Sequence, residues 1–87
     1  MKDYMSFGDA LQALKDGKQV ARHGWNGKNM YLYIEDCLSF TIREGAYKGR
    51  VRKYEPCICM FTADGTHQPG WLASQKDMLA DDWFEVK

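Results

Sequence analysis

The stretch S-F-G-D-A-L-Q-A-L-K-D-G, residues 6–17, determines how the chain begins to fold. Ser6 is a typical helix N-cap, Asp9 follows at the spacing of a capping-box partner, and Gly17 stands where a helix C-terminus favours glycine. Four apolar residues between them recur at helical spacing: Phe7, Ala10, Leu11 and Leu14. The stretch therefore predicts an amphipathic helix with one apolar stripe.

Short apolar segments further along the chain predict strands. They cover residues 18–22, 30–34, 57–62, 66–72 and 82–86. Asp64-Gly65 is a hairpin-turn signal between two of them. Ser74 and Asp77 repeat the capping-box spacing and predict a second, short helix. We therefore expect residues 1–87 to form a single α+β domain, a small antiparallel sheet with an N-terminal helix and a short C-terminal helix.

Composition limits the possible functions. A chain of 87 residues buries a thin core, and three Trp, five Tyr and four Phe are more than such a core usually absorbs. Some aromatic side chains should therefore lie at a subunit interface or a ligand surface. A formal net charge of zero argues against DNA or an anionic membrane as a partner.

The ends of the chain and its thiols favour a cytoplasmic protein. The first residues, M-K-D-Y-M-S-F, lack the apolar region of a signal peptide, and no apolar run is long enough to span a bilayer. Cys37, Cys57 and Cys59 are odd in number and form no disulfide framework, which suits a reducing compartment.

A basic segment interrupts the middle of the chain. Between residues 43 and 53 it holds five cations against one anion, Glu44. A solvated hairpin or flexible loop is one interpretation, because runs of charge usually form solvated faces. Contact with phosphate is the alternative.

Catalytic and metal-binding patterns are missing. His23 and His67 stand at no recognisable spacing from the three cysteines, and neither phosphate-binding glycine motif occurs. Cys57 and Cys59 are two residues apart on a predicted strand, so they face the same way and resemble packed residues. We expect no catalytic residue, no metal site and no cofactor.

The loop R-H-G-W-N-G-K-N, residues 22–29, carries chemistry suited to recognition. Trp25 could stack on a planar base, Asn26 could pair with the edge of an adenine, and Arg22 could meet a phosphate. The structural alternative is that Trp25 closes the end of the core and that Asn26-Gly27 is an ordinary turn.

The predicted second helix offers the same two interpretations. Free backbone N–H groups after Ser74 could hold an anion, and Asp77 could accept from a ribose diol. Both residues could equally do no more than cap the helix.

Two stretches resemble the bacteriophage Thoeris anti-defence type 2 family. S-F-G-D-A-L-Q-A-L-K-D-G-K-Q-V-A-R-H-G-W-N-G-K resembles its N-terminal signature, and G-W-L-A-S-Q-K-D-M-L-A-D-D-W resembles its C-terminal one. M-Y-L-Y lies between them in the family's order. Ala73 departs from the family, which often has proline there, and the basic segment matches nothing in it.

The resemblance implies a sponge, a protein without enzymatic activity that sequesters an immune messenger in the cytoplasm of the infected bacterium. The messenger of Thoeris defence is a cyclic isomer of ADP-ribose such as glycocyclic ADP-ribose. Family members bind it in pockets at the interfaces of a homotetramer, and some also hold cyclic oligonucleotides of the CBASS defence system at separate sites.

The family's binding residues carry over onto matching positions of this chain. The resemblance implies that the adenine stacks on the loop at Trp25, Asn26 and Gly27, with Arg22 in support. The second signature places the remaining ligand-binding residues at the same pocket: Trp71, Ser74 and Asp77. Trp83 and Met78 are expected in the core.

Two other functions remain open at this point. One is an enzyme that cleaves the messenger or a related nucleotide, for which Asp77, the Asp81-Asp82 pair, Glu35 or a histidine would supply the base. The other is a phage protein-interaction module that uses its exposed aromatic residues to bind another protein.

Overall fold

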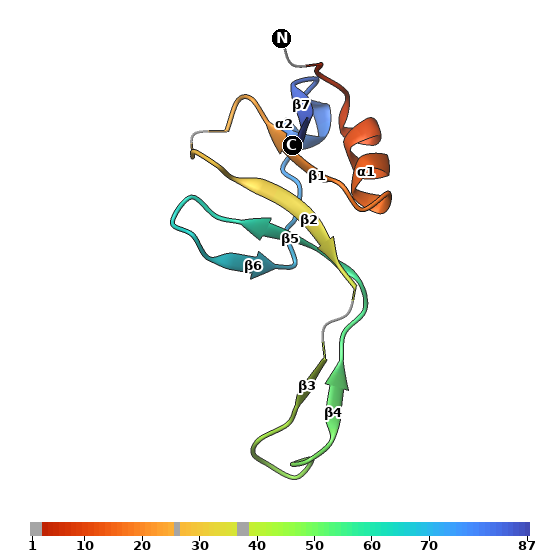
Figure 1. The fold of residues 1–87 in the computed structure, drawn as a ribbon, viewed down its shortest axis with the longest axis vertical. Coiled ribbons are helices and arrows are strands. Elements are labelled where there is room, and N and C mark those ends of the chain that lie inside the picture. The colour runs from red at the N-terminus through yellow and green to blue at the C-terminus, as the bar shows by residue number, and fades with distance from the viewer. Residues whose placement is uncertain (1–2, 26, 37–38) are drawn as a thin grey trace.

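A computed structural model describes residues 3–25, 27–36 and 39–87. It has the predicted α+β fold, with one helix near each end of a mainly antiparallel structure (Figure 1). In chain order the elements are α1 (Phe7–Lys15), β1 (Gln19–Arg22), β2 (Tyr31–Glu35), β3 (Ser39–Thr41), β4 (Val51–Lys53), β5 (Cys57–Phe61), β6 (His67–Pro69), α2 (Gln75–Leu79) and β7 (Trp83–Val86).

The main sheet has five strands in the order β6-β5-β2-β1-β7, all pairing antiparallel. β2 and β5 pair along five positions, from Tyr31 opposite Phe61 to Glu35 opposite Cys57. β1 and β2 pair only at Val20 opposite Leu32. The loop that joins β1 to β2 therefore leaves the sheet between its two longest ladders, the β2–β5 pair and the β1–β7 pair.

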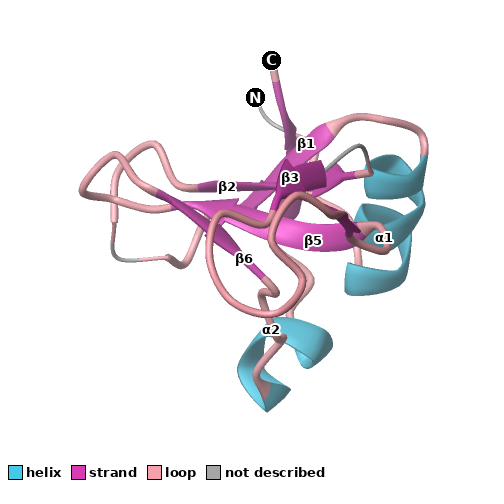
Figure 2. Ribbon diagram, turned by 90° about the horizontal axis from the view of Figure 1, so that it is seen from below, coloured by secondary structure: helices cyan, strands magenta, loops and turns pink. Residues whose placement is uncertain are grey.

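One face of the sheet carries the core. Leu32 lies directly opposite Met60, and opposed residues of antiparallel strands share a face, so both point toward α1 with Val20. The six buried core residues are Ala10, Leu14, Val20, Leu32, Met60 and Trp83. Figure 2 shows α1 and α2 on the same side of the sheet. The predicted apolar stripe of α1 is confirmed, since Ala10 and Leu14 are fully buried.

Both ends of α1 follow the sequence signals. The Ser6 hydroxyl accepts from the Asp9 N–H at 3.2 Å. At the other end Gly17 takes a positive φ of 86°, its N–H donates to the Leu14 carbonyl, and the Lys18 N–H donates to the Ala13 carbonyl. This pair of bonds is a Schellman motif, which needs the left-handed conformation that glycine adopts at low cost.

The opposite face of the sheet is aromatic, and neither helix covers it. Tyr31 stacks on Phe61 with ring centroids 5.1 Å apart, and the Tyr33 hydroxyl lies 2.7 Å from Nδ1 of His67. Cys57 and Cys59 share this face, with their Sγ atoms 3.7 Å apart. The two thiols do face the same way, as predicted, but away from the helix-side core.

The basic segment is part of a hairpin that leaves the body of the protein (Figure 1). β3 and β4 form a separate two-stranded sheet, and all three residues of β4 are exposed. Backbone bonds between Ile42 and both Gly49 and Arg50 close the hairpin. We call residues 39–53 the arm. It makes the molecule elongated, with extents of 52 × 26 × 25 Å.

Two expectations differ from the structure. Met78 was expected in the core but is 41% exposed, because only Asp77 of the short α2 turns inward. The strand expected over residues 66–72 is confined to His67–Pro69, since Gly70 turns the chain with φ of 77°. Within the described residues, no helix is long and apolar enough to cross a membrane.

Candidate functional site

The loop between β1 and β2 is fixed by the carboxylate of Asp82, just before β7. Asp82 Oδ2 accepts from the Gly24 N–H at 2.8 Å, and its other oxygen accepts from Arg22 Nε at 2.8 Å. A Cβ on Gly24 would lie 2.9 Å from that carboxylate. Glycine at this position therefore lets the backbone approach Asp82 closely enough to be bound.

Asp77 fixes the same loop from α2. One of its oxygens accepts from Arg22 Nη1 at 2.8 Å and from the Trp25 indole N–H at 3.2 Å. The other accepts from the Ser74 N–H, and the Ser74 hydroxyl accepts from the Asp77 N–H, each at 3.1 Å. The predicted capping box is thus present, and its acid also binds the loop.

The two carboxylates and Arg22 form one partly buried ionic cluster. The Arg22 and Asp77 side chains are 16% and 12% exposed. Hydrogen bonds from Arg22 hold the pKa of Asp82 below its usual range, and the pKa of Arg22 is raised by Asp82 and then by Asp77. Burial acts to raise the pKa of Asp77, but bonds from Arg22, Ser74 and Trp25 outweigh it and the pKa is lowered. All three groups are therefore charged at neutral pH.

Three tryptophans meet beside this cluster. Trp25 contacts Trp83 edge to face at 5.4 Å between ring centroids and Trp71 at 6.4 Å. Trp83 is fully buried, and its indole N–H donates to the Asp77 carbonyl at 3.0 Å. Trp25 itself is only half-buried. One edge of Trp25 thus packs on the core while part of the ring stays available.

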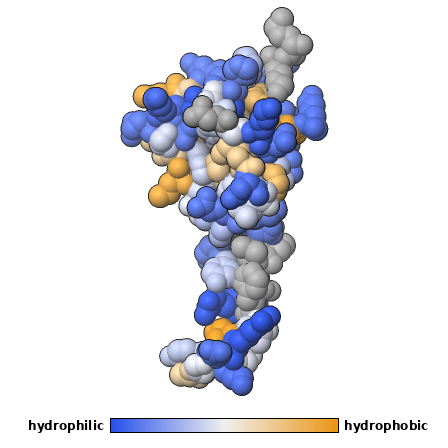
Figure 3. Space-filling model, turned by 90° about the vertical axis from the view of Figure 1, so that its left-hand side faces the viewer, coloured by the Kyte–Doolittle hydropathy of each residue, from blue (hydrophilic) through white to orange (hydrophobic). Residues whose placement is uncertain are grey.

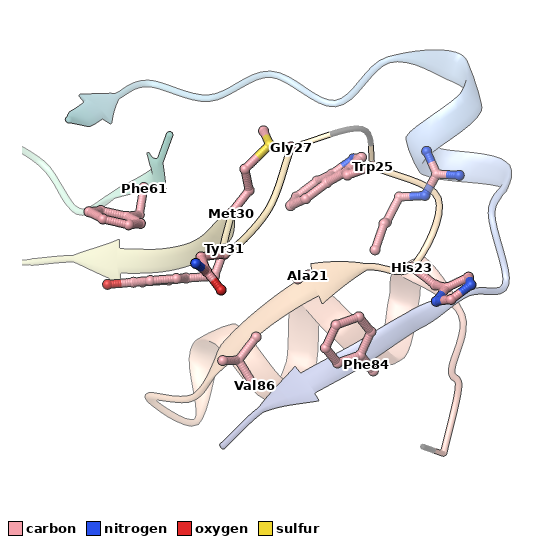
Figure 4. Close-up of a pocket in the computed structure, with 11 residues that line it drawn as sticks. Ala21, His23, Trp25, Gly27, Met30, Tyr31, Phe61, Phe84 and Val86 are labelled. Atoms are coloured by element: carbon pink, nitrogen blue, oxygen red, sulfur yellow. The ribbon is translucent and has the colours of Figure 1, made fainter. Parts of the chain in front are cut away.

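That available part of Trp25 lines a cavity of about 450 Å³, which we call the aromatic pocket (Figure 4). Trp25, Met30, Tyr31 and Phe61 form one wall in this view, and Ala21, Phe84 and Val86 on β1 and β7 form the other. Its remaining lining residues are Arg22, His23, Gly27 and Asn29. The volume lies within the range of small-molecule sites, about 300–1,000 Å³.

Gly27 is required where the loop returns to the sheet. A Cβ there would lie 2.2 Å from Met30 Sδ and 2.8 Å from the Ala63 Cβ. No neighbour can keep its place at such distances, so a larger residue would push Met30 out of the pocket wall. Asn29 then takes φ of 64°, a left-handed conformation that asparagine tolerates.

The structure brings most of the sequence-predicted site residues together, but in two layers. Arg22, Trp25 and Gly27 line the aromatic pocket. Asp77 lies behind Trp25, where Ser74 caps α2, and Trp71 contacts the Trp25 ring. Asn26 lies outside the described residues. The donors of Arg22 are bonded to carboxylates, so the structure gives this residue a supporting contact.

Sequence reasoning missed most of the aromatic lining of the pocket. His23, Tyr31, Phe61 and Phe84 line the cavity from the loop and three strands. A signal was available in β2, where Tyr31 and Tyr33 alternate with Leu32 and Ile34. Two apolar faces on one strand indicate that both sides of the sheet pack against something.

Comparison with known proteins identifies the family. Residues 5–86 match the model of the Thoeris anti-defense 2-like domain. The chain is also 45% identical to Thoeris anti-defense 2 of Bacillus phage SP01, over 95% of this chain and 96% of that protein. The family is named for an anti-defence role and not for a reaction. This chain belongs to the Thoeris anti-defense 2-like family.

Proposed function

We propose that the protein is a sponge: it binds a cyclic ADP-ribose-type messenger, such as glycocyclic ADP-ribose, and withholds it without cleaving it. In this role it acts in the cytoplasm of the infected host and blocks Thoeris signalling. The observation that carries the proposal is the half-buried Trp25 ring in the wall of a pocket of ligand size. Family membership supplies the defence system whose messenger would enter it.

The aromatic pocket suits a nucleotide base. Trp25, Tyr31, Phe61 and Phe84 provide several ring faces around one cavity. Stacking of a base on an aromatic ring contributes about 1–3 kcal/mol. Trp25 is also prevented from turning, because its indole N–H is bonded to Asp77 and its edge packs on Trp83. A ring held in place before binding loses little entropy when the ligand arrives.

The predicted residues that lie behind Trp25 support the ones that line the pocket. Asp77 and Asp82 hold Arg22 and the loop backbone, so Trp25 stays over the pocket. Trp71 packs edge to face against the Trp25 ring. In this proposal Arg22, Ser74 and Asp77 act by positioning the loop, while Trp25 and Gly27 lie at the ligand. Three of the five Arg22 N–H groups are used in bonds to the two carboxylates, so direct contact with a phosphate would fall to the other two.

Binding without cleavage is favoured by what lines the pocket. Among the described lining residues the ionisable side chains are Arg22, His23 and Tyr31, and no carboxylate is present. Cleavage of a glycosidic or phosphate bond by general acid–base catalysis needs a positioned base and acid. Asp77 and Asp82 are both bonded to Arg22, which leaves His23 as the candidate base among the described lining residues.

We further propose that the chain assembles as a homotetramer, with ligand pockets completed at its interfaces. Three exposed apolar residues gather near α2: Leu72 at 89%, Leu79 at 77% and Met78 at 41% exposed. The aromatic face of the sheet is a second candidate surface. Contiguous exposed apolar groups of this kind typically mark interaction sites.

A depletion and release assay tests the sponge. Glycocyclic ADP-ribose is incubated with excess protein, the protein is removed by filtration, and the filtrate is assayed. The bound fraction is then heated and assayed again. We expect the messenger to vanish from the filtrate and to return intact on heating. Loss of the messenger without recovery would make the protein an enzyme, and an undepleted filtrate would refute binding. Repeating the assay with a cyclic oligonucleotide tests a separate second site.

A further inference from the structure

The arm has charges that segregate along its length. Five cations and Glu44 occupy residues 43–53, so this part carries four net positive charges. Where the arm joins the body, its flanks carry three acids, Glu35, Asp36 and Glu55, and no Lys or Arg. We call these three residues the acidic base. Because the chain is neutral overall, everything outside residues 43–53 carries four net negative charges.

Large apolar side chains of the arm and of its flank are exposed. Tyr47 and Val51 of the arm are 60% and 58% exposed, and Tyr54, which follows the arm, is 44% exposed. Arg50 lies over the Tyr47 ring, 5.1 Å from its centroid, which keeps this ring on the basic part of the arm. An isolated two-stranded hairpin is marginally stable in water and generally needs another layer against it. Figure 3 shows the arm projecting from the body as a mainly hydrophilic extension with a small apolar patch.

A second cavity lies at the acidic base. It has a volume of about 600 Å³, and Glu35 and Glu55 are among its lining residues. Its other walls are mainly apolar or aromatic: Tyr33, Tyr54, Pro56, Cys57, Cys59, His67, Pro69 and Gly70. Carboxylates beside an apolar floor suit a segment that brings cations and an aromatic ring together. The basic part of the arm is such a segment.

We propose that the arm docks on a second copy of this chain, with its basic part in the cavity at the partner's acidic base. Two arms that lie antiparallel about a two-fold axis place each basic end at the other's acidic end. The contact is self-complementary, as a two-fold interface requires. It covers Tyr47 and Val51 of each copy with the other's apolar cavity. The proposal deepens the self-assembly part of the proposed function and does not depend on the messenger.

Charge reversal on the two halves of this contact gives a direct test. The tip variant Lys48→Glu/Arg50→Glu/Arg52→Glu takes residues 43–53 from four net positive to two net negative charges. The base variant Glu35→Lys/Glu55→Lys takes the acidic base from three net negative charges to one net positive charge. In a dimer of either variant alone, both arm-to-base contacts bring like charges together. In a mixed dimer of the two variants, both contacts again join opposite charges. Mass is measured by light scattering at micromolar protein in low salt, with the melting temperature as a check of folding.

We expect the parent to be oligomeric, each variant alone to have at most half the parent's mass, and the equimolar mixture to recover it. The neutral variant Lys48→Gln/Arg50→Gln should lie between parent and tip variant, which covers the case where a reversed pair fails to fold. Variants that keep the parent's mass, or folded variants that do not recover it when mixed, would overturn the proposal. So would an assembly that falls apart with nuclease, since the arm would then hold nucleic acid. A monomeric parent would refute self-assembly itself, leaving messenger binding untouched.

Discussion

The Trp25 loop and the arm look alike in sequence, since both are polar, basic and interrupted by glycines, yet they differ in what holds them. The loop is bound by Asp77 and Asp82 from elements more than fifty residues away and packs on two tryptophans. The arm is held by the ladder between its own strands and by bonds of its own turn. A rigid loop can present a binding surface in advance, whereas an arm that is exposed over residues 43–53 is suited to meeting a partner.

The largest effect should come from breaking the loop's support at Asp77. Asp77→Ala leaves Arg22 without one carboxylate, frees the Trp25 indole and removes half of the capping box. Loss of the bond to Arg22, the bond to Trp25 and the capping interaction together should cost about 3–5 kcal/mol, although Asp82 still pairs with Arg22. Chemical denaturation should show this loss of unfolding free energy, while the exposed neighbour Asp81→Ala should change it by less than about 0.5 kcal/mol. Equal effects of the two substitutions would mean that the loop is not held from α2.

Trp25→Ala should affect stability and binding together. The ring packs on Trp71 and Trp83, so its removal should cost about 2–4 kcal/mol of unfolding free energy. Loss of stacking should weaken messenger affinity by about 5-fold to 150-fold in calorimetric titration. Trp25→Phe keeps a ring but not the bond to Asp77, and should lose less of both. A variant that melts lower yet binds normally when folded would confine Trp25 to a structural role.

Gly27→Ala tests the close approach at the pocket wall. Its methyl group would collide with Met30, which should cost about 1–3 kcal/mol of unfolding free energy and reshape the aromatic pocket. The double variant Gly27→Ala/Met30→Ala should be less destabilised than the sum of the two single variants, because the colliding sulfur is gone. Strict additivity in denaturation would show that the loop simply moves aside.

Acid should loosen the loop. The pKa values of Asp77 and Asp82 are lower in the folded protein than their unfolded value of about 3.9. Their contribution to stability is therefore complete above about pH 4–5 and is lost as pH falls through the folded values. Unfolding free energy measured between pH 6 and pH 2 should fall in this window, and Asp82→Asn should flatten the profile. A profile that the substitution leaves unchanged would assign the acid sensitivity elsewhere.

The smallest effect on folding should come from the arm. Arg52 is exposed and lies outside the core, so Arg52→Ala should change the unfolding free energy of the monomeric protein by less than about 0.5 kcal/mol. The measurement is made at high salt, which screens contacts between copies. A loss above 1 kcal/mol under these conditions would show that the arm contributes to the fold of a single chain.

Local signals predicted the fold well because they act over a few residues. Each correct prediction rests on contacts within one helical turn or one strand pair. They are the caps of α1, the capping box of Ser74 and Asp77, and the alternating pattern of β2. Met78 was placed wrongly because a five-residue helix has too few turns for a pattern to show which side faces the core. The presence of Phe61 and Phe84 at one pocket could not be predicted, since β5 and β7 are brought to it by the strand order of the sheet.

Only part of the candidate site could be predicted from the sequence, for a similar reason. Trp25 and Arg22 stand out in the sequence, but Asp82, which accepts from Arg22, lies sixty positions away from it. From the sequence alone, a charged residue in a binding loop suggests a contact with the ligand, because its counter-ions are not known. The ion pairs with Asp77 and Asp82 give Arg22 a supporting contact that its place in the sequence does not reveal.

A crystal structure of the protein with glycocyclic ADP-ribose tests the central claim most directly. We expect the adenine on the face of Trp25 within the aromatic pocket, with Arg22 still bonded to Asp77 and Asp82. A messenger bound away from Trp25, or one whose phosphates have drawn Arg22 from both carboxylates, would contradict the account.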